Sequence, residues 1–174
     1  MEGLNRISVS DYRNQGKLPL VVLLDNVRSG LNVGSIFRTA DAFAVEKILL
    51  CGITVQPPHR EILKTALGST DSVAWEYYSD PSQAVQQLKT SGYIVLAIEQ
   101  TSDKVWLHEF DPAPGAKYAM VLGNEVDGVE DSLLEQCDGV LEIPQFGTKH
   151  SLNVAVAAGI VLWEAQKKLL ALLS

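Results

Sequence analysis

Residues 18–43, LPLVVLLDNVRSGLNVGSIFRTADAF, decide the fold that we expect for this chain. The first eight residues form an apolar run rich in Val and Leu, which is typical of a strand buried on both faces. A polar loop with a glycine follows, and the next residues are apolar at helical spacing. A strand that enters a helix through such a loop is the repeating unit of α/β proteins, which commonly bind ligands beyond the carboxyl ends of their strands.

Two further segments have the same organisation, an apolar run followed by a polar loop with a glycine. They are LGNEVDGVEDS at 122–132 and IPQFGTKHSLNVAVAAG at 143–159. Glycine loops offer free backbone N–H groups and allow close approach to a ligand. We therefore expect the loops within 26–43, 122–132 and 143–159 to converge on one active site.

Apolar runs recur along the whole chain, and helical patterning lies between most of them. This alternation predicts an α/β fold with a mainly parallel sheet of about six strands covered by helices. The segment TSDKVWLHEFDPAPGAK at 101–117 contains prolines and a glycine, so we expect a surface connection there. The length of 174 residues fits a single domain over 1–174, with 1–17 as a short N-terminal extension. The expected strands lie in LPLVVLLD, VEKILLCGI, SVAWEYYS, YIVLAIEQ, KYAMVLGN and GVLEIPQ.

The helix in the first segment separates packing residues from one free side chain. We expect Asn32 to be its N-cap, and Arg38 then points roughly 140° away from Val33 at 100° per residue. Arg38 is therefore available either to a ligand or to solvent, and the spacing leaves both open. The stripe that packs on the sheet consists of Val33, Ile36, Phe37, Ala40 and Phe43.

The last helix, which we expect over about 151–173, is apolar on more than one side. One stripe contains Val154, Ala158, Val161, Leu162 and Ala165, and a second, nearly opposite, contains Val156, Ile160 and Trp163. The second stripe predicts a homodimer through this helix with Trp163 as an anchor. The alternative is that another helix of the same chain covers it. Ser151 could be no more than the N-cap of this helix.

The charge of the chain does not by itself favour a nucleic-acid partner. The net charge is −7, but residues 1–40 carry five basic and three acidic side chains, so the positive end coincides with the first polar loop. Phosphate binding depends on clustered Lys and Arg. We expect weak, salt-sensitive RNA affinity unless dimerisation brings two such patches together.

Cysteine and histidine usage indicates neither a disulfide framework nor a metal site. Cys51 and Cys137 have no CxxC spacing, and His59, His108 and His150 lack metal-ligand spacing. No apolar run reaches the roughly 18 residues of a membrane span, and the N-terminus has no apolar secretory core. We expect a cytoplasmic protein with reduced thiols, no metal and no membrane association.

The polar residues of the three loops resemble the signature motifs of the SpoU-type (TrmH-like) RNA ribose 2′-O-methyltransferases of the SPOUT superfamily. The resemblance covers roughly residues 20–165, and the motifs occur in the family's order. Two departures are Ala44, where the family usually has glycine, and Lys149 with His150, where an acidic residue is common. The matching residues are Asn32, Arg38, Gly123, Asn124, Glu125, Gly128, Ser151, Leu152 and Asn153.

The resemblance implies a C-terminal trefoil knot and S-adenosylmethionine as cofactor, held by backbone groups near Gly123, Ile143 and Leu152. The knot follows from the resemblance alone, because periodicity never indicates one. The implied substrate is structured RNA, and we expect tRNA rather than rRNA because the chain is short. Some members of the family have an extra N-terminal RNA-binding domain, and we expect none in this chain. The substrate RNA would then be contacted by the short ends of the chain or by the dimer.

Five residues are implied as catalytic. A free guanidinium is difficult to deprotonate, so we expect Arg38 to stabilise the developing alkoxide or to hold the neighbouring phosphate, although a role as base stays open. We expect Asn32 to orient Arg38 or the ribose, and Glu125 to fix the arginine and the loops by charge-assisted hydrogen bonds. Ser151 and Asn153 would complete the pocket.

Two other functions compete with this interpretation. A dinucleotide enzyme is disfavoured because G-x-G-x-x-G does not follow the first strand and G-x-x-x-x-G-K-[ST] does not occur. A noncatalytic RNA-binding or assembly module that retains the fold is the main alternative. The joint presence of the five implied catalytic residues argues against it.

Overall fold

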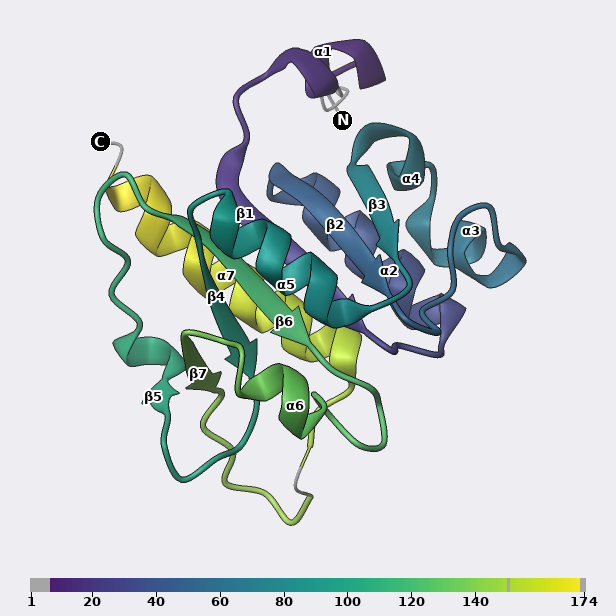
Figure 1. The fold of residues 1–174 in the computed structure, drawn as a ribbon. Coiled ribbons are helices and arrows are strands. Elements are labelled where there is room, and N and C mark those ends of the chain that lie inside the picture. Colours follow the sequence, from purple (N-terminus) through teal and green to yellow (C-terminus); the bar gives the residue numbers. More distant parts are fainter. Residues whose placement is uncertain (1–6, 150, 173–174) are drawn as a thin grey trace.

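The centre of the molecule is one sheet of seven strands, and every pairing between them is parallel (Figure 1). The computed structural model describes residues 7–149 and 151–172, so His150 lies outside the described residues. The strand order is β3-β2-β1-β6-β4-β7-β5. The strands are β1 (Leu18–Asp25), β2 (Val45–Cys51), β3 (Ala74–Tyr78), β4 (Tyr93–Ile98), β5 (Val105–Trp106), β6 (Lys117–Leu122) and β7 (Gly139–Glu142).

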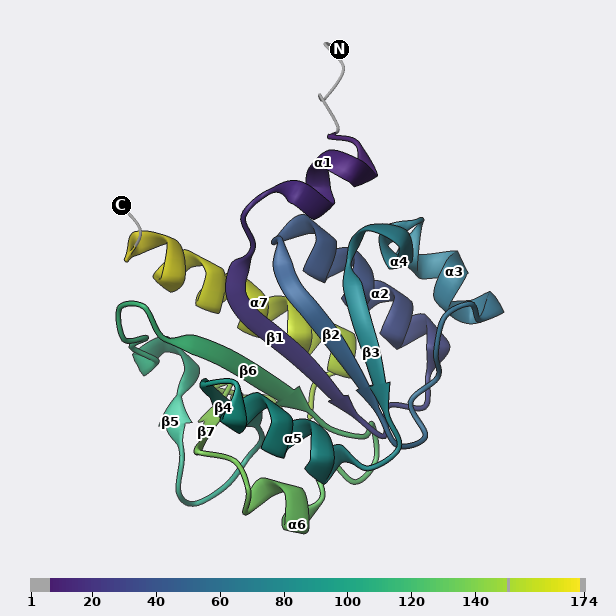
Figure 2. The same ribbon diagram turned by 45° about the horizontal axis from the view of Figure 1, so that its top comes forward.

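Helices cover both faces of the sheet, as the alternation of apolar runs predicted. Helices α2 and α7 lie on one face and α5 on the other, so the sheet separates two apolar cores (Figure 2). Side chains of β1 alternate between them, with Val22 and Leu24 in the first core and Val21 and Leu23 in the second. The helices are α1 (Val9–Asn14), α2 (Gly30–Ala42), α3 (Arg60–Ala66), α4 (Ser69–Ser72), α5 (Pro81–Thr90), α6 (Asp131–Leu134), α7 (Val154–Ala171) and the 3-10 helix η1 (Leu107–Glu109).

The parallel α/β prediction is confirmed, but the expected surface connection at 101–117 is more ordered than predicted. It contains β5 and η1, and β5 pairs with the edge of β7 through Val105 with Leu141 and Trp106 with Glu142. A strand of two residues is too short to show the alternation by which strands are recognised in a sequence.

The N-cap predicted for α2 and the alternative N-cap considered for α7 were both wrong, for the same reason. Ser29, not Asn32, is the N-cap of α2, because its hydroxyl accepts the backbone N–H of Asn32 at 3.3 Å. Asn153, not Ser151, is the N-cap of α7, and its side-chain oxygen accepts the backbone N–H groups of Ala155 and Val156. Each of these segments has several residues suited to capping, so composition alone does not select one.

The two stripes of α7 differ in burial. The first, from Val154 to Ala165, is buried against the sheet. The second remains exposed, with Trp163 at 56%, so the alternative that a helix of the same chain covers it is wrong. Trp163 has one aromatic neighbour, Phe43 at the end of α2, with ring centroids 6.0 Å apart.

The exit from α2 is left-handed at Ala44, which has φ 51°. This is the conformation that glycine adopts most easily, and it explains why the family usually has glycine at this position. None of the helices in the described part of the chain has the length and apolarity needed to span a bilayer.

Candidate active site

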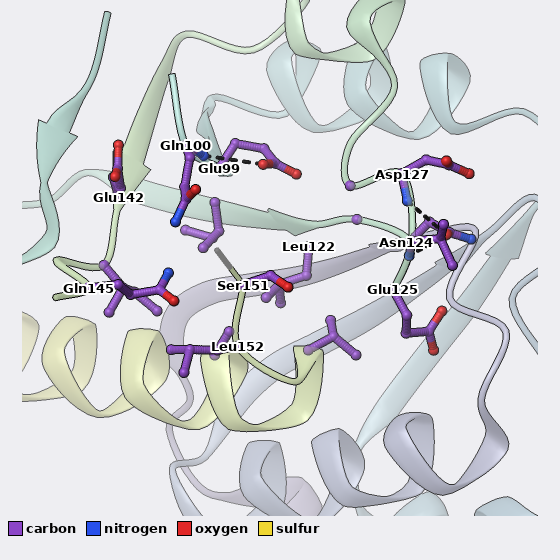
Figure 3. Close-up of a pocket in the computed structure, with 17 residues that line it drawn as sticks. Glu99, Gln100, Leu122, Asn124, Glu125, Asp127, Glu142, Gln145, Ser151 and Leu152 are labelled. Atoms are coloured by element: carbon purple, nitrogen blue, oxygen red, sulfur yellow. Dashed lines mark hydrogen bonds between the residues drawn. The ribbon is translucent and has the colours of Figure 1, made fainter. Parts of the chain in front are cut away.

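A cavity of about 240 Å³ lies at the carboxyl ends of β4, β6 and β7 (Figure 3). This is slightly below the roughly 300–1,000 Å³ usual for small-molecule sites. The loop after β6 contributes Gly123 and Glu125, and the loop between β7 and α7 contributes Ile143, Ser151 and Leu152. The three residues expected at the cofactor therefore all line one cavity, together with two of those expected to be catalytic.

The lining combines apolar walls with carboxylates. Ile98, Leu122, Ile143, Leu152 and Val154 supply the apolar surface, while the described lining residues include no Lys, Arg or His. A cavity of this kind favours a ligand with apolar faces and positive charge and disfavours a phosphate group. The carboxylates are Glu99, Glu125, Asp127 and Glu142, the last paired with Lys104 at 2.9 Å.

The first polar loop does not line the cavity but joins its rim through Glu125. The carboxylate accepts the backbone N–H of Arg28 at 3.1 Å and that of Ser29 at 3.0 Å. It also accepts the side-chain amide of Asn32 at 3.2 Å. Asn153 donates its own amide to the side-chain oxygen of Asn32 at 3.1 Å. One chain of hydrogen bonds thus connects all three loops at the start of α2 and α7.

These donors also keep Glu125 ionised. Burial alone would raise its pKa, but the hydrogen bonds from the backbone of Ser29 and Arg28 outweigh burial, and the pKa lies below its usual value of 4.5. A carboxylate at the N-terminus of α2 is also favoured by the helix dipole. Glu125 therefore acts as a fixed anion that holds the loops.

Glycines set the shape of the loop after β6. A side chain at Gly123 would clash with the backbone of Gly128 and Val129, so this strand end requires glycine. Asn124 and Gly128 exchange two backbone hydrogen bonds, and Gly128 has φ 73°. The side chain of Asn124 then donates to the carbonyl of Asn26 at 2.8 Å, which ties this loop to the first one.

Three predicted site residues, Asn32, Asn153 and Arg38, do not line the cavity. Asn32 and Asn153 connect to its rim through Glu125, but Arg38 does not. Arg38 is exposed on α2 and borders a separate hollow between α1, α2 and α4, beside Asp41 and Ser69. Its guanidinium has no hydrogen bond or ion pair with any described residue. Glu125, expected to fix this arginine, instead holds the backbone of the first loop.

Glu99 and Gln100 are among the lining residues that the sequence analysis did not identify. Both follow β4 directly, at the same edge of the sheet as the predicted loops, and this position was the signal that could have revealed them. Glu99 accepts the backbone N–H of Val129 at 2.8 Å and so supports the loop after β6. No glycine stands beside them, so in the sequence they look like the end of the apolar run YIVLAIEQ.

The cysteines take no part in the site. Burial raises the pKa of Cys51 to about 12 and that of Cys137 to about 11, so both thiols stay protonated near neutral pH. Over residues 7–149 and 151–172, no three His, Cys, Asp or Glu side chains stand together in a group able to hold a metal ion.

Known proteins match nearly the whole chain. A 23S rRNA (guanosine-2′-O-)-methyltransferase, RlmB, of Neisseria meningitidis is 29% identical over 94% of this chain and 65% of its own length. A tRNA (guanosine(18)-2′-O)-methyltransferase of Aquifex aeolicus is 32% identical over 86% of this chain and 69% of its own. The chain spans about two thirds of the length of these relatives.

A solved structure confirms the predicted fold. The AdoMet-bound rRNA methyltransferase from Sinorhizobium meliloti is 30% identical to this chain and has a TM-score of 0.80. The match covers 93% of this chain and 61% of the Sinorhizobium meliloti chain. The shared fold is the SPOUT fold, which implies a trefoil knot in the C-terminal part. Residues 19–163 match the model of the SpoU rRNA Methylase family. The chain therefore belongs to the SpoU family of RNA methylases.

Proposed function

We propose that this chain transfers a methyl group from S-adenosylmethionine to a ribose 2′-hydroxyl of structured RNA. The observation that carries the proposal is the cavity, which has apolar walls and four carboxylates but no basic side chain among its described residues. Membership of the SpoU family and the names of the relatives support the same reaction. A dinucleotide, with its phosphates, fits this lining poorly.

The lining suits the cofactor chemically. S-adenosylmethionine has a cationic sulfonium and an apolar adenine face, and it supplies a methyl group that is already activated for transfer. Leu152 and Ile143 offer apolar contact, and the close packing at Gly123 leaves its backbone beside the cavity. The carboxylate of Glu99 or Asp127 stabilises positive charge on the ligand.

The remaining residues position RNA and the loops. Both ends of the Asn32 amide are engaged, one with Glu125 and one with Asn153, so Asn32 positions α2 rather than the ribose. The hydroxyl of Ser151 borders the cavity at its exposed mouth and is available to hydrogen bond the RNA. A guanidinium is a poor base, so we assign Arg38 to stabilising the developing 2′-alkoxide or holding the adjacent phosphate, and the proton leaves to phosphate or water.

Arg38 requires a second copy of the chain for this role, because it borders a different hollow from the cavity. The exposed stripe of Val156, Ile160 and Trp163 offers the surface for a homodimer. Such a surface on a terminal helix suits an isologous contact. In the proposed dimer, Arg38 of one copy serves the cavity of the other.

The substrate class is structured RNA, with tRNA and rRNA as the two candidates. The Aquifex aeolicus relative is named for tRNA, whereas the RlmB relatives, which head the matches, are named for 23S rRNA. The relatives therefore lend no support to our expectation of tRNA. A noncatalytic RNA-binding module is the alternative function.

Calorimetric titration of S-adenosylmethionine tests the proposal, with Leu152→Arg as the variant. Leu152 is 38% exposed, so arginine there is tolerated by the fold but puts a cation into the cavity. We expect saturable binding to the wild type, strongly weakened binding to the variant, and methyl transfer from labelled cofactor to bulk RNA by the wild type only. Binding of RNA without methyl transfer would favour the noncatalytic module.

A further inference from the structure

Most of the lysines and arginines hold a group of the protein itself. Lys47, Lys89 and Lys104, for example, pair with Glu76, Asp138 and Glu142. Within residues 7–149 and 151–172, five basic side chains have neither a hydrogen bond nor an ion pair. Four of these five lie on the loop before α2, on α2 or on α3, although this is a small part of the chain. The five are Arg28, Arg38, Arg60, Lys64 and Lys149.

Three of them lie on α3 and just before α2, and these two helices pack against each other. Arg60 and Lys64 are exposed one turn apart on α3, so their Cβ atoms are roughly 6 Å from each other. Helix α3 packs closely on the start of α2, where Thr65 donates to the carbonyl of Leu31 at 2.9 Å. Arg28 directly precedes this start. We call Arg28, Arg60 and Lys64 the α3 surface.

The α3 surface begins at the rim of the cavity. The backbone N–H of Arg28 donates to Glu125, and Glu125 lines the cavity. The approach between α2 and α3 is fixed, because a side chain at Gly34 would clash with the carbonyl of Ile62. Arg60 and Lys64 are therefore held by rigid helices at one side of the site.

The charge of this region is opposite to that of the whole chain. The α3 surface carries three basic side chains, and the acidic side chains beside it are Glu61 on α3 and Glu125 at the cavity rim, whereas the net charge of the chain is −7. A local positive surface on an acidic protein attracts a polyanion to that place and repels it elsewhere. Cations that are not paired within the protein are also free to neutralise RNA phosphates. This displaces the counterions condensed on the RNA and makes the affinity depend on salt.

We propose that the α3 surface binds the phosphate backbone of the RNA next to the nucleotide that enters the cavity. This inference rests on the proposed function, because it assumes that RNA is the substrate. The contacts are to phosphates, so they position the RNA and contribute little to sequence preference. The path runs from the cavity rim over Arg28 to α3.

The test compares two double variants that lose the same charge. Arg60→Gln with Lys64→Gln removes two cations of the α3 surface. Lys47→Gln with Lys89→Gln is the matched control, since these lysines form ion pairs with Glu76 and Asp138. Affinity for bulk tRNA and for rRNA is measured by fluorescence anisotropy between about 50 and 200 mM salt, a range over which phosphate contacts strongly change affinity.

We expect the α3 variant to lower the slope of log affinity against log salt by about 1.4 to 1.8, from roughly 0.7 to 0.9 per lost phosphate contact. Over this fourfold range of salt, the factor by which affinity falls is then about ten times smaller for the α3 variant than for the wild type. The control keeps the wild-type slope. Calorimetry with S-adenosylmethionine gives the same affinity for all three proteins, which shows that the fold and cavity are intact.

Three results would overturn the inference. One is an α3 variant with the wild-type slope and affinity. Another is an equal loss in the control, which would mean that only net charge matters. The third is a change of oligomeric state in the α3 variant by sedimentation, which would make this surface a protein interface. Absence of both cofactor binding and methyl transfer in the wild type would instead refute the proposed function.

Discussion

Glu125 joins parts of the chain that are far apart in sequence. Its two oxygens hold backbone N–H groups 97 and 96 residues away, at the start of α2. We predict that Glu125→Gln destabilises the protein by about 0.5–1 kcal/mol at neutral pH, the lower range for a helix cap because the side chain is exposed. Chemical denaturation of both proteins measures this difference.

The effect of Glu125→Gln depends on pH in a defined direction. The pKa of Glu125 is lowered in the folded protein, so the unfolded chain binds the proton more readily and the carboxylate contributes stability above its usual pKa of 4.5. That contribution is lost as the pH falls from about 4.5 through the lower folded value. We expect the stability difference to shrink in this range; a difference that grows on acidification would contradict the assignment.

Gly123 offers a second prediction at the residue scale. Gly123→Ala forces a methyl group into the backbone of Gly128, so we expect a loss of about 1–3 kcal/mol and much weaker binding of S-adenosylmethionine. Gly147→Ala is the control, because it lies in the other cavity loop with open space around it. Thermal unfolding and calorimetry should separate the two variants. Equal behaviour would show that the tight turn at Gly123 does not shape the cavity.

The positions of the polar loops predicted that they converge at one edge of the sheet, and the resemblance to the SpoU family supplied the individual residues. Gly123, Ile143 and Leu152 line the cavity as expected, because loops that follow parallel strands meet at one edge of the sheet. The hydrogen-bond partners of Glu125, and the position of Arg38 away from the cavity, could not be predicted. These partners depend on which of several hydrogen-bonding groups at the start of α2 faces a loop about a hundred residues later in the chain. A sequence pattern does not give the spatial distance between such groups.

At the scale of elements, α7 carries a surface that the fold does not need. We predict that Ile160→Glu with Trp163→Glu converts a homodimer into a monomer, because charged residues at the centre of an interface oppose association. The variant should still bind S-adenosylmethionine, since neither residue lines the cavity, but should lose methyl transfer. Sedimentation velocity and both assays test this.

Val105→Glu is the control for the α7 variant. Val105 is also an exposed apolar residue, but it lies on the edge strand β5, away from α7. We expect the Val105→Glu variant to sediment as the wild-type protein does. A wild-type protein that is monomeric at assay concentrations would contradict the assignment of α7 as an interface.

The elements themselves were predictable to different degrees. Long strands such as β1 and the stripe of α2 were evident because their burial repeats over many residues. The two-residue β5 and the first residue of each helix were not, since they depend on a few tertiary contacts. The second apolar stripe of α7 indicated a surface that needs a partner, but the sequence left open whether a second copy or another helix of the same chain covers it.

At the scale of the whole molecule, the account requires that two copies build each site. Mixing Arg38→Ala with Leu152→Arg tests this, because each variant alone should be inactive for a different reason. An equimolar mixture should recover about a quarter of the wild-type activity, since half of the dimers are mixed and one of their two sites is intact. No recovery, after exchange of subunits is verified, would place Arg38 and the cavity in the same copy.

The trefoil knot and the dimer are properties of the whole chain that local pattern does not encode. The knot was expected from resemblance to a family, and the shared fold implies it. The dimer remains a proposal that explains why Arg38 lies apart from the cavity that it should serve.

Identification of the methylated product tests the central claim most directly. The wild-type protein is incubated with S-adenosylmethionine labelled in its methyl group and with bulk tRNA or rRNA, and the RNA is then hydrolysed in alkali. A 2′-O-methyl group removes the hydroxyl that attacks the neighbouring phosphodiester, so the account predicts label in alkali-resistant dinucleotides. Label only in mononucleotides with methylated bases, or no label in either RNA, would contradict it.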